Sequence, residues 1–213
     1  MPKRYAIKEI FATLQGEGAQ AGTPAVFLRF AGCNLGYEVC PWCDTDWVKA
    51  SYVLDLADTL ERVRETARAG FGGEPRDLLL VATGGEPSLQ LDRELSDGLR
   101  SLGYRIAMES NGAQPVDRSL VDWLTISPKQ KEFQQKDGDE LKLLFTGGAP
   151  GITPDVQAVR EIASGTNFAH YFLQPVDLPE EGGPNYEETI AAVMELGPPW
   201  RLSVQTHKVA NIP

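Results

Sequence analysis

The chain has 213 residues, of which 42% are hydrophobic and 23% are charged, a composition that excludes wholesale disorder, a collagen-like repeat and a small disulfide-stapled fold. With 20 Lys and Arg against 30 Asp and Glu, the formal net charge is -10, which disfavours nucleic acid or an anionic membrane as the main partner. No stretch approaches the length of an apolar membrane span, and the first residues do not resemble a signal peptide. We therefore expect a soluble, cytoplasmic protein with one domain over residues 1–213.

The first predicted elements form two strand, loop and helix units. A strand is predicted at Pro24–Phe30, where apolar and aromatic residues lead directly to a loop with all the cysteines. Apolar residues then recur at helical spacing over 56–67, and Gly70 is predicted to cap that helix. The apolar run Asp77–Val81 predicts a strand buried on both faces, and a helical pattern at Leu89–Leu102 follows it.

The same alternation continues along the rest of the chain. Further strands are predicted at Tyr104–Met108, Trp123–Ile126, Leu141–Phe145, Tyr171–Leu173 and Leu202–Val204. Two more helices are predicted near Pro154–Ala163 and Tyr186–Leu196. Such alternation implies a mostly parallel sheet, but this chain is too short for a complete eight-unit barrel. We expect an α/β fold in the form of an incomplete, open TIM-like barrel.

Residues with functional chemistry gather where the predicted strands end. Ligands of parallel α/β folds bind beyond the carboxyl ends of the strands. The segments at those ends are Cys33, Thr83–Glu86, Glu109–Asn111, Ser127–Lys129, Gln174–Pro175 and Gln205–His207. The sequence therefore predicts one functional rim.

The three cysteines, Cys33, Cys40 and Cys43, are close in sequence and too few for a disulfide framework. Thiolates at this spacing can converge on one soft metal centre from a single loop. A structural zinc ion usually needs four protein ligands, and the only histidines, His170 and His207, lie far downstream. A [4Fe-4S] cluster with three thiolates leaves one iron for a small molecule, so the spacing favours it. Zinc and buried free thiols stay as alternatives.

Five motifs extend this interpretation across nearly the whole chain. They are Phe11–Gly18, Cys40–Thr45, Thr83–Pro87, Ser127–Lys129 and Val204–Lys208. Together they resemble the 7-carboxy-7-deazaguanine synthase family, radical S-adenosylmethionine (SAM) enzymes of queuosine biosynthesis. One departure is visible: six residues separate Cys33 from Cys40, where the radical SAM superfamily usually has three.

The resemblance implies that Cys33, Cys40 and Cys43 hold one [4Fe-4S] cluster, to which SAM binds. It also implies a set of SAM-binding residues: Trp42, Cys43, Asp44, Gly85, Glu86, Glu109, Ser127, Pro128, Lys129, Gln174, Pro175, Val176 and Asp177. Gly84 and Gly85 would allow backbone to approach the methionine part closely, and Glu86 would accept a hydrogen bond from its ammonium group. The alternative for this segment is a plain strand-to-helix turn.

The substrate implied by the resemblance is 6-carboxy-5,6,7,8-tetrahydropterin. Its expected binding residues are Leu14, Gln15, Gly16, Arg29, Thr83, His207 and Pro213. Arg29 would offer a planar charged fork to the carboxylate, although an arginine on an edge strand could simply reach solvent. His207 could instead be a core histidine, and Pro213, whose carboxylate would close the pocket, could instead belong to a disordered end.

The resemblance also implies that Thr45 binds Mg²⁺, with substrate oxygens and waters completing the coordination. A flavodoxin-like electron donor and a homodimer are implied too, with no direct nucleic-acid or membrane partner. The implied activity is a lyase-type ring contraction of the pterin to 7-carboxy-7-deazaguanine with loss of ammonia. Two alternatives stay open: an activating enzyme of the glycyl-radical type that acts on a protein, and a zinc-stabilised binding module without catalysis.

Overall fold

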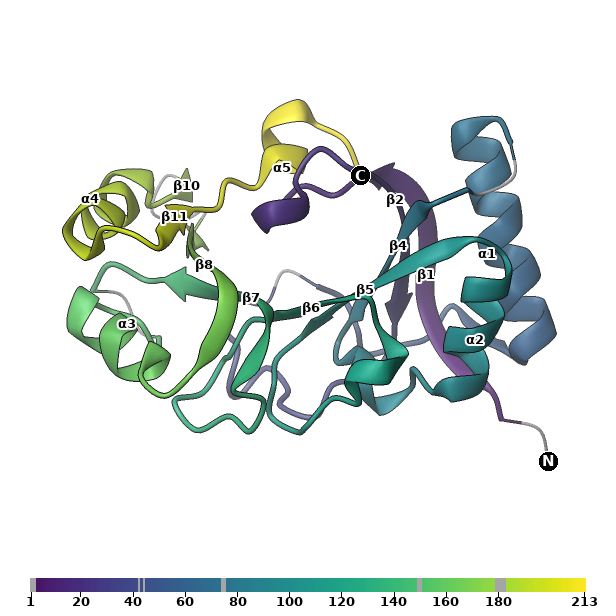
Figure 1. Ribbon diagram of the computed structural model, residues 1–213, viewed down its shortest axis with the longest axis horizontal. Coiled ribbons are helices and arrows are strands. Elements are labelled where there is room, and N and C mark those ends of the chain that lie inside the picture. The colour runs from purple at the N-terminus through teal and green to yellow at the C-terminus, as the bar shows by residue number, and fades with distance from the viewer. Residues whose placement is uncertain (1–2, 42, 44, 74–75, 149–150, 179–182) are drawn as a thin grey trace.

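A nine-stranded sheet forms the frame of the molecule (Figure 1). The computed structural model describes residues 3–41, 43, 45–73, 76–148, 151–178 and 183–213. The strands of this sheet are β1 (Tyr5–Leu14), β2 (Pro24–Phe30), β3 (Tyr52–Leu54), β4 (Leu78–Gly84), β5 (Tyr104–Ser110), β6 (Trp123–Ile126), β7 (Asp137–Phe145), β8 (Asn167–Pro175) and β11 (Trp200–Leu202). A small second sheet pairs β9 (Asp177–Leu178) with β10 (Gly183–Pro184).

Helices alternate with these strands. The α-helices are α1 (Leu56–Phe71), α2 (Arg93–Ser101), α3 (Val156–Ala163), α4 (Tyr186–Leu196) and α5 (Thr206–Ala210). Short 3-10 turns occur at η1 (Gly18–Gln20), η2 (Pro87–Leu89) and η3 (Arg118–Leu120). Among the residues described, no helix combines the length and apolar character needed to cross a membrane.

The sheet order is β11-β8-β7-β6-β5-β4-β2-β1-β3. Every neighbouring pair from β2 to β11 is parallel, whereas β1 runs antiparallel to β2 and to β3. Since this order starts at β11 and ends at β3, the described strands form an open barrel. The prediction of an incomplete barrel with mostly parallel strands is confirmed.

The core lies between the sheet and the helices outside it. Leu80 on β4 and Leu95 and Leu99 on α2 are fully buried in one apolar cluster, in which α2 packs on β5 and α1. Each such side chain contributes about 1.5–3 kcal/mol by leaving water. β4 is buried at five consecutive positions, because neighbouring strands cover its edges and both of its faces are packed. The apolar run in the sequence reflects this double burial.

Two predicted helix boundaries were wrong. α1 continues past Gly70 and is capped at Gly72, which has a φ of 73°. Gly70 serves packing instead, because a Cβ there would lie 2.3 Å from the Cβ of Ala12 on β1. The predicted helix at Leu89–Leu102 begins only at Arg93, since the Asp92 side chain caps it by accepting from the Leu95 amide.

Several strand predictions also need correction. β7 and β8 begin at Asp137 and Asn167, four residues before the predicted starts. β1 was not predicted as a strand, although Tyr5 and Ile7 alternate with less buried residues. The predicted strand Leu202–Val204 lies two residues earlier, at Trp200–Leu202, where its residues pair with Tyr171–Leu173. The ring of Trp200 packs edge-on against that of Tyr171 with centroids 5.3 Å apart, which favours this register.

Candidate active site

A cavity of about 490 Å³ lies at the carboxyl ends of the parallel strands. The predicted site residues that line it are Leu14, Gln15, Gly16, Arg29, Cys33, Cys40, Cys43, Thr45, Thr83, Gly85, Glu109, Ser127, Lys129, Gln174, Pro175, Val176, Asp177, His207 and Pro213. Glu86 and Pro128 do not line it. Trp42 and Asp44 lie outside the described residues. The predicted rim is therefore one continuous pocket.

The three cysteines face this cavity from the loop after β2. The Cys43 amide donates to the Cys40 carbonyl at 3.1 Å, so the two thiols share one tight turn. Cys40 is buried, and burial raises the pKa of its thiol. Within the described residues, no three His, Cys, Asp or Glu side chains converge as ligands of a single metal ion. The soft donors fit an iron–sulfur cluster, in which each thiolate binds a different iron.

The glycine turn after β4 packs directly on the backbone that leads to Cys33. Gly84 has a φ of 132°, and a Cβ on it would lie 2.2 Å from the carbonyl oxygen of Phe30. A Cβ on Gly85 would lie 2.1 Å from the carbonyl oxygen of Gly32. The Glu86 amide donates to that same carbonyl at 2.9 Å. These glycines therefore place the cysteine loop against the turn.

Glu86 holds the turn from inside the protein. It is 0% exposed, and its carboxylate accepts from the Ser88 amide at 3.0 Å, the Ser110 hydroxyl at 2.9 Å and the Asn111 amide at 2.8 Å. A buried carboxylate is stable only with such partners. The contacts give Glu86 a structural role in joining the ends of β4 and β5, and its predicted bond to the SAM ammonium stays a prediction.

Arg29 and Thr83 lie side by side, because they are register partners on the parallel strands β2 and β4. Arg29 donates from Nε to Glu9 at 2.7 Å, and its guanidinium lies 5.9 Å from the centre of the Phe11 ring. The rings of Phe11 and Phe27 stack with centroids 5.2 Å apart. All five residues line the cavity.

Phe11, Phe27 and Glu9 were missing from the predicted site. Phe27 and Arg29 are two apart on β2, so strict alternation puts both on the same face. That period-two pattern is the signal that could have found the aromatic wall. The wall offers a flat apolar surface next to a cation, which suits a planar ligand with a carboxylate.

Gln15 is predicted to contact the substrate, but its side chain is largely engaged within the protein. It is 5% exposed, donates from Nε2 to Glu109 at 2.8 Å and accepts from the Glu17 amide at 3.1 Å. These bonds fix the shape of the loop and place Glu109, and the predicted contact of Gln15 with the substrate stays a prediction.

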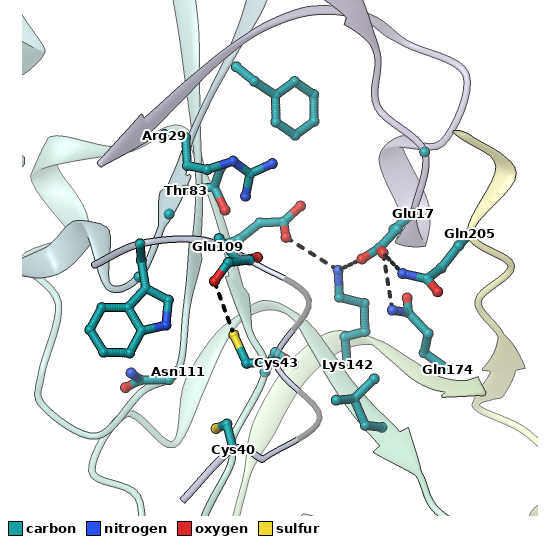
Figure 2. A pocket seen from close by; sticks show the side chains of 18 of the residues that line it. Glu17, Arg29, Cys40, Cys43, Thr83, Glu109, Asn111, Lys142, Gln174 and Gln205 are labelled. Atoms are coloured by element: carbon teal, nitrogen blue, oxygen red, sulfur yellow. Dashed lines mark hydrogen bonds and ion pairs between the residues drawn. The ribbon is translucent and has the colours of Figure 1, made fainter. Parts of the chain in front are cut away.

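Glu17 and Lys142 form an ion pair that sequence reasoning missed (Figure 2). Lys142 also lies 3.4 Å from Glu109, and Glu17 accepts from Gln174 at 3.1 Å and from Gln205 at 2.7 Å. Burial alone would raise the pKa of Glu17, but the charge of Lys142 and the hydrogen bonds outweigh it and hold that pKa at about 2.

The C-terminal segment lies on the loop after β1 (Figure 1). Thr206 donates to the Gly16 carbonyl from its amide and from its hydroxyl, each at 2.9 Å. A Cβ on Gly16 would lie 2.1 Å from Nδ1 of His207, so the glycine lets the ring pack closely. Thr13 donates from its hydroxyl to the Pro213 carbonyl at 2.9 Å. His207 and Pro213 are thereby brought to the pocket next to the predicted substrate loop.

Lys129 and Thr45 lie near the cysteines on the cavity wall. Lys129 donates to the Ser127 hydroxyl at 2.6 Å, and burial lowers its pKa, although the nearby Cys40 opposes that shift. The Thr45 carbonyl accepts from the Tyr37 hydroxyl at 3.3 Å. The predicted magnesium ligand Thr45 thus lies at the cavity, and its role stays a prediction.

Comparison with known proteins agrees with this geometry. No protein-family model matches the chain. It is 42% identical to a 7-carboxy-7-deazaguanine synthase of Caulobacter vibrioides over 98% of the chain and 99% of the relative, and 41% identical to one of Bordetella pertussis over the same shares. The crystal structure of QueE from Escherichia coli matches with a TM-score of 0.68 at 25% identity, covering 96% of this chain and 95% of that one.

A radical SAM methyltransferase from Sphaerobacter thermophilus matches with a TM-score of 0.52 at 14% identity, over 85% of this chain and 66% of that one, and supports the fold alone. The high identity over nearly the full length of both chains shows common descent with the synthases. The chain belongs to the 7-carboxy-7-deazaguanine synthase family.

Proposed function

We propose that the protein converts 6-carboxy-5,6,7,8-tetrahydropterin to 7-carboxy-7-deazaguanine, with loss of ammonia, in queuosine biosynthesis. The observation that carries this proposal is that one cavity contains the three cysteines, the glycine turn and the wall of Arg29 and Thr83. Family membership implies a [4Fe-4S] cluster and SAM. Family membership also favours an enzyme that acts on a small molecule over an enzyme that activates a protein and over a zinc-stabilised binding module.

Cys33, Cys40 and Cys43 are the residues that would hold the cluster. When bound, the cluster supplies the electron that splits SAM into methionine and a 5′-deoxyadenosyl radical. The protein's part is to fix the three thiolates and to exclude water. Contact between the glycine turn and the backbone of Gly32 serves the first task, and burial of Cys40 serves the second.

The proposed SAM side of the cavity runs from the glycine turn to the end of β8. Glu109 offers a carboxylate to ribose hydroxyls, and Lys129 offers an ammonium from a half-buried position. The other predicted SAM residues that line this side are Gly85, Ser127, Gln174, Pro175, Val176 and Asp177, together with the cluster ligand Cys43. Their positions on successive strand ends form an extended wall that suits a long ligand.

The proposed pterin side is the part of the cavity lined by Phe11, Phe27, Arg29 and Thr83. Arg29 would bind the substrate carboxylate, the stacked rings of Phe11 and Phe27 would contact the flat heterocycle, and Thr83 would bond to its edge. The remaining side of the pterin site would be closed by Leu14, Gly16, His207 and Pro213. The hydrogen bonds of Thr206 to Gly16 and of Thr13 to Pro213 support this placement. Thr45 would contribute its hydroxyl to a Mg²⁺ ion that also binds substrate oxygens.

The wider setting is also proposed. Residues 1–213 would act as one radical SAM domain, which the continuous nine-stranded sheet supports. The protein would be a cytoplasmic homodimer that takes electrons from a flavodoxin-like donor, as the family resemblance suggests.

An anaerobic assay tests the proposed activity. Reconstituted protein is incubated with SAM, a reductant, Mg²⁺ and the pterin, and the product is identified by mass spectrometry. We expect 7-carboxy-7-deazaguanine with SAM regenerated, and no product from Cys40→Ala. An unchanged pterin in the presence of an intact cluster would reject the assignment. SAM consumed in proportion to product would favour a protein activase, and colourless protein with zinc would favour the binding module.

A further inference from the structure

Lys142 is a buried cation to which the proposed function assigns no contact with SAM, the substrate or the cluster. Its side chain, on β7, is 4% exposed, and its Nζ contacts carboxylates from two other parts of the chain, Glu17 and Glu109. A buried ammonium is unstable without such partners. Burial alone would lower the pKa of Lys142, but Glu109 and Glu17 outweigh it and raise that pKa, so the charge persists.

Glu17 belongs to the loop that follows β1. This loop carries the proposed substrate residues Gln15 and Gly16, and Leu14 is the last residue of β1. Side chains from distant strands hold this loop. Besides Lys142, the Glu17 carboxylate is bound by Gln174 on β8 and by Gln205 after β11. The next amides are also held: Gly18 donates to the Ser203 hydroxyl at 3.1 Å, and Ala19 donates to Glu140 at 2.8 Å.

This loop crosses the open side of the barrel. β1 lies near one end of the sheet order, whereas β7, β8 and β11 lie at the other end. Figure 1 shows η1, at the tip of the loop, beside α5 and the end of β11. Backbone hydrogen bonds join neighbouring strands along the sheet, whereas the loop is held across the opening mainly by side chains. Among the side chains that hold this loop, Lys142 is the one that forms an ion pair with Glu17.

The second contact of Lys142 leads to the proposed SAM side. Glu109 Oε2 lies 3.4 Å from the ammonium, while Glu109 Oε1 accepts from Gln15 at 2.8 Å. One lysine therefore touches a carboxylate on the substrate loop and a carboxylate on the SAM wall (Figure 2). Loss of its charge would leave two partly buried carboxylates, with side chains 15% and 21% exposed, without the cation that both contact.

We propose that Lys142 is a positioning residue that holds the substrate loop, residues 14–19, across the barrel opening through Glu17 and at the same time orients Glu109 on the SAM wall. The identity of the two ligands rests on the proposed function. The attachment of the loop rests only on the contacts within the chain.

Hydrogen–deuterium exchange of the 213-residue chain, before and after anaerobic reconstitution, tests the attachment. In Lys142→Met, we expect the amides of residues 17–19 to exchange at least tenfold faster, while those of β4 and β5 stay within about twofold. Glu17→Gln, an isosteric change that removes one charge of the pair, should accelerate the same amides to a smaller extent. Arg160→Met is the matched control, because Arg160 pairs with Glu195 on the surface at 3.9 Å.

A combined Glu17→Gln and Lys142→Met variant tests whether the pair acts as a unit. Since it no longer leaves the Glu17 charge unpaired, we expect its loop to exchange more slowly than that of Lys142→Met alone. Unchanged loop exchange in both single variants would overturn the proposal. Equal acceleration throughout the chain would also overturn it, because it would mean that Lys142 only supports global stability.

Kinetics of the reconstituted enzyme test the link to both ligands. We expect Lys142→Met to raise the KM for the pterin at least tenfold and to increase the ratio of SAM cleaved to product formed, while Lys142→Arg restores part of both. An unchanged KM and cleavage ratio would refute the coupling. If the parent protein does not turn over the pterin, the proposed function fails, whereas the exchange experiment still decides the role of Lys142 in the loop.

Discussion

Replacing Gly85 by alanine tests how tightly the glycine turn and the cysteine loop must fit. Gly85 is not among the residues with positive φ, so alanine adds no backbone strain there. The effect comes from contact alone. The new Cβ would lie 2.1 Å from the carbonyl oxygen of Gly32 and 3.0 Å from the Cβ of Cys33. Because the first contact is with backbone, a side-chain rotation cannot relieve it.

The size of the effect follows from the distances. Contacts of a Cβ with another heavy atom are essentially never shorter than 3.0 Å, so the Gly32 carbonyl has to retreat by about 1 Å. That carbonyl accepts from the Glu86 amide at 2.9 Å, and the bond would be stretched or broken. Overpacking of this kind costs about 1–3 kcal/mol. For a chain of this length, the loss corresponds to a fall in Tm of roughly 2–12 °C.

Calorimetric melting of the cluster-free protein measures the stability change, and iron content after anaerobic reconstitution measures the effect on the cysteine loop. We expect Gly85→Ala to melt earlier and to retain less iron, since Cys33 is displaced with the loop. Gly73→Ala is the matched control, because Gly73 is exposed and a Cβ there meets no described atom within 4 Å. If Gly85→Ala has the same Tm and iron content as this control, the close contact of Gly85 with the Gly32 carbonyl is not required for stability or for cluster binding.

Three further outcomes are expected. Arg29→Lys keeps the charge but loses the planar fork, so pterin affinity measured by titration should fall about tenfold while SAM cleavage without pterin persists; equal affinity would argue against the carboxylate contact. Glu86→Gln would put an amide donor against the Asn111 amide and should cost about 1–3 kcal/mol in urea unfolding, with exposed Glu132→Gln unchanged as control. Because the folded pKa of Glu17 is near 2 and its usual value is 4.5, its stabilisation is present above about pH 4.5 and is lost as the pH falls toward 2. Urea unfolding at about pH 5 and pH 3 should therefore show a smaller pH dependence in Glu17→Gln than in the parent, and an identical dependence would contradict the assigned pKa.

Sequence patterns predicted the bounds of those strands and helices whose burial is regular along their length. β2, β6 and α4 have the predicted bounds, because burial on both faces of a strand or on one face of a helix leaves a clear apolar pattern. β1 was missed because its residues after Ile7 are only partly buried and include Lys8 and Glu9, whose side chains face the cavity. A strand that lines a site loses the apolar alternation that would identify it.

The predicted site followed largely from the resemblance, and the structure adds what motifs do not contain. The adjacency of Arg29 and Thr83 depends on the register of β2 and β4, which no local pattern specifies. Lys142 looks like an ordinary surface lysine in the sequence. It alternates with Glu140 and Leu144, while Leu141, Leu143 and Phe145 lie on the other face of this part of β7. Two charges at that spacing indicate that one face meets polar groups. The sequence contains this pattern, but it does not show that Lys142 pairs with Glu17, which lies 125 positions away.

An open barrel explains why charged side chains have this role. A closed barrel of parallel strands fills its interior with side chains in layers and leaves no room for a cofactor and a substrate together. Opening the barrel creates that room but removes the backbone bonds that would join its two ends. In this protein the opening of the barrel is bridged by the loop of residues 14–19. Because this loop lies next to the proposed ligand cavity, a thick apolar layer cannot cover it. Ion pairs and amide contacts, such as those of Glu17, can hold such a loop while leaving polar groups at the cavity wall. Lys142 contacts both Glu17 on this loop and Glu109 at the end of β5, so the proposed positioning role joins the bridge across the opening to the proposed SAM side.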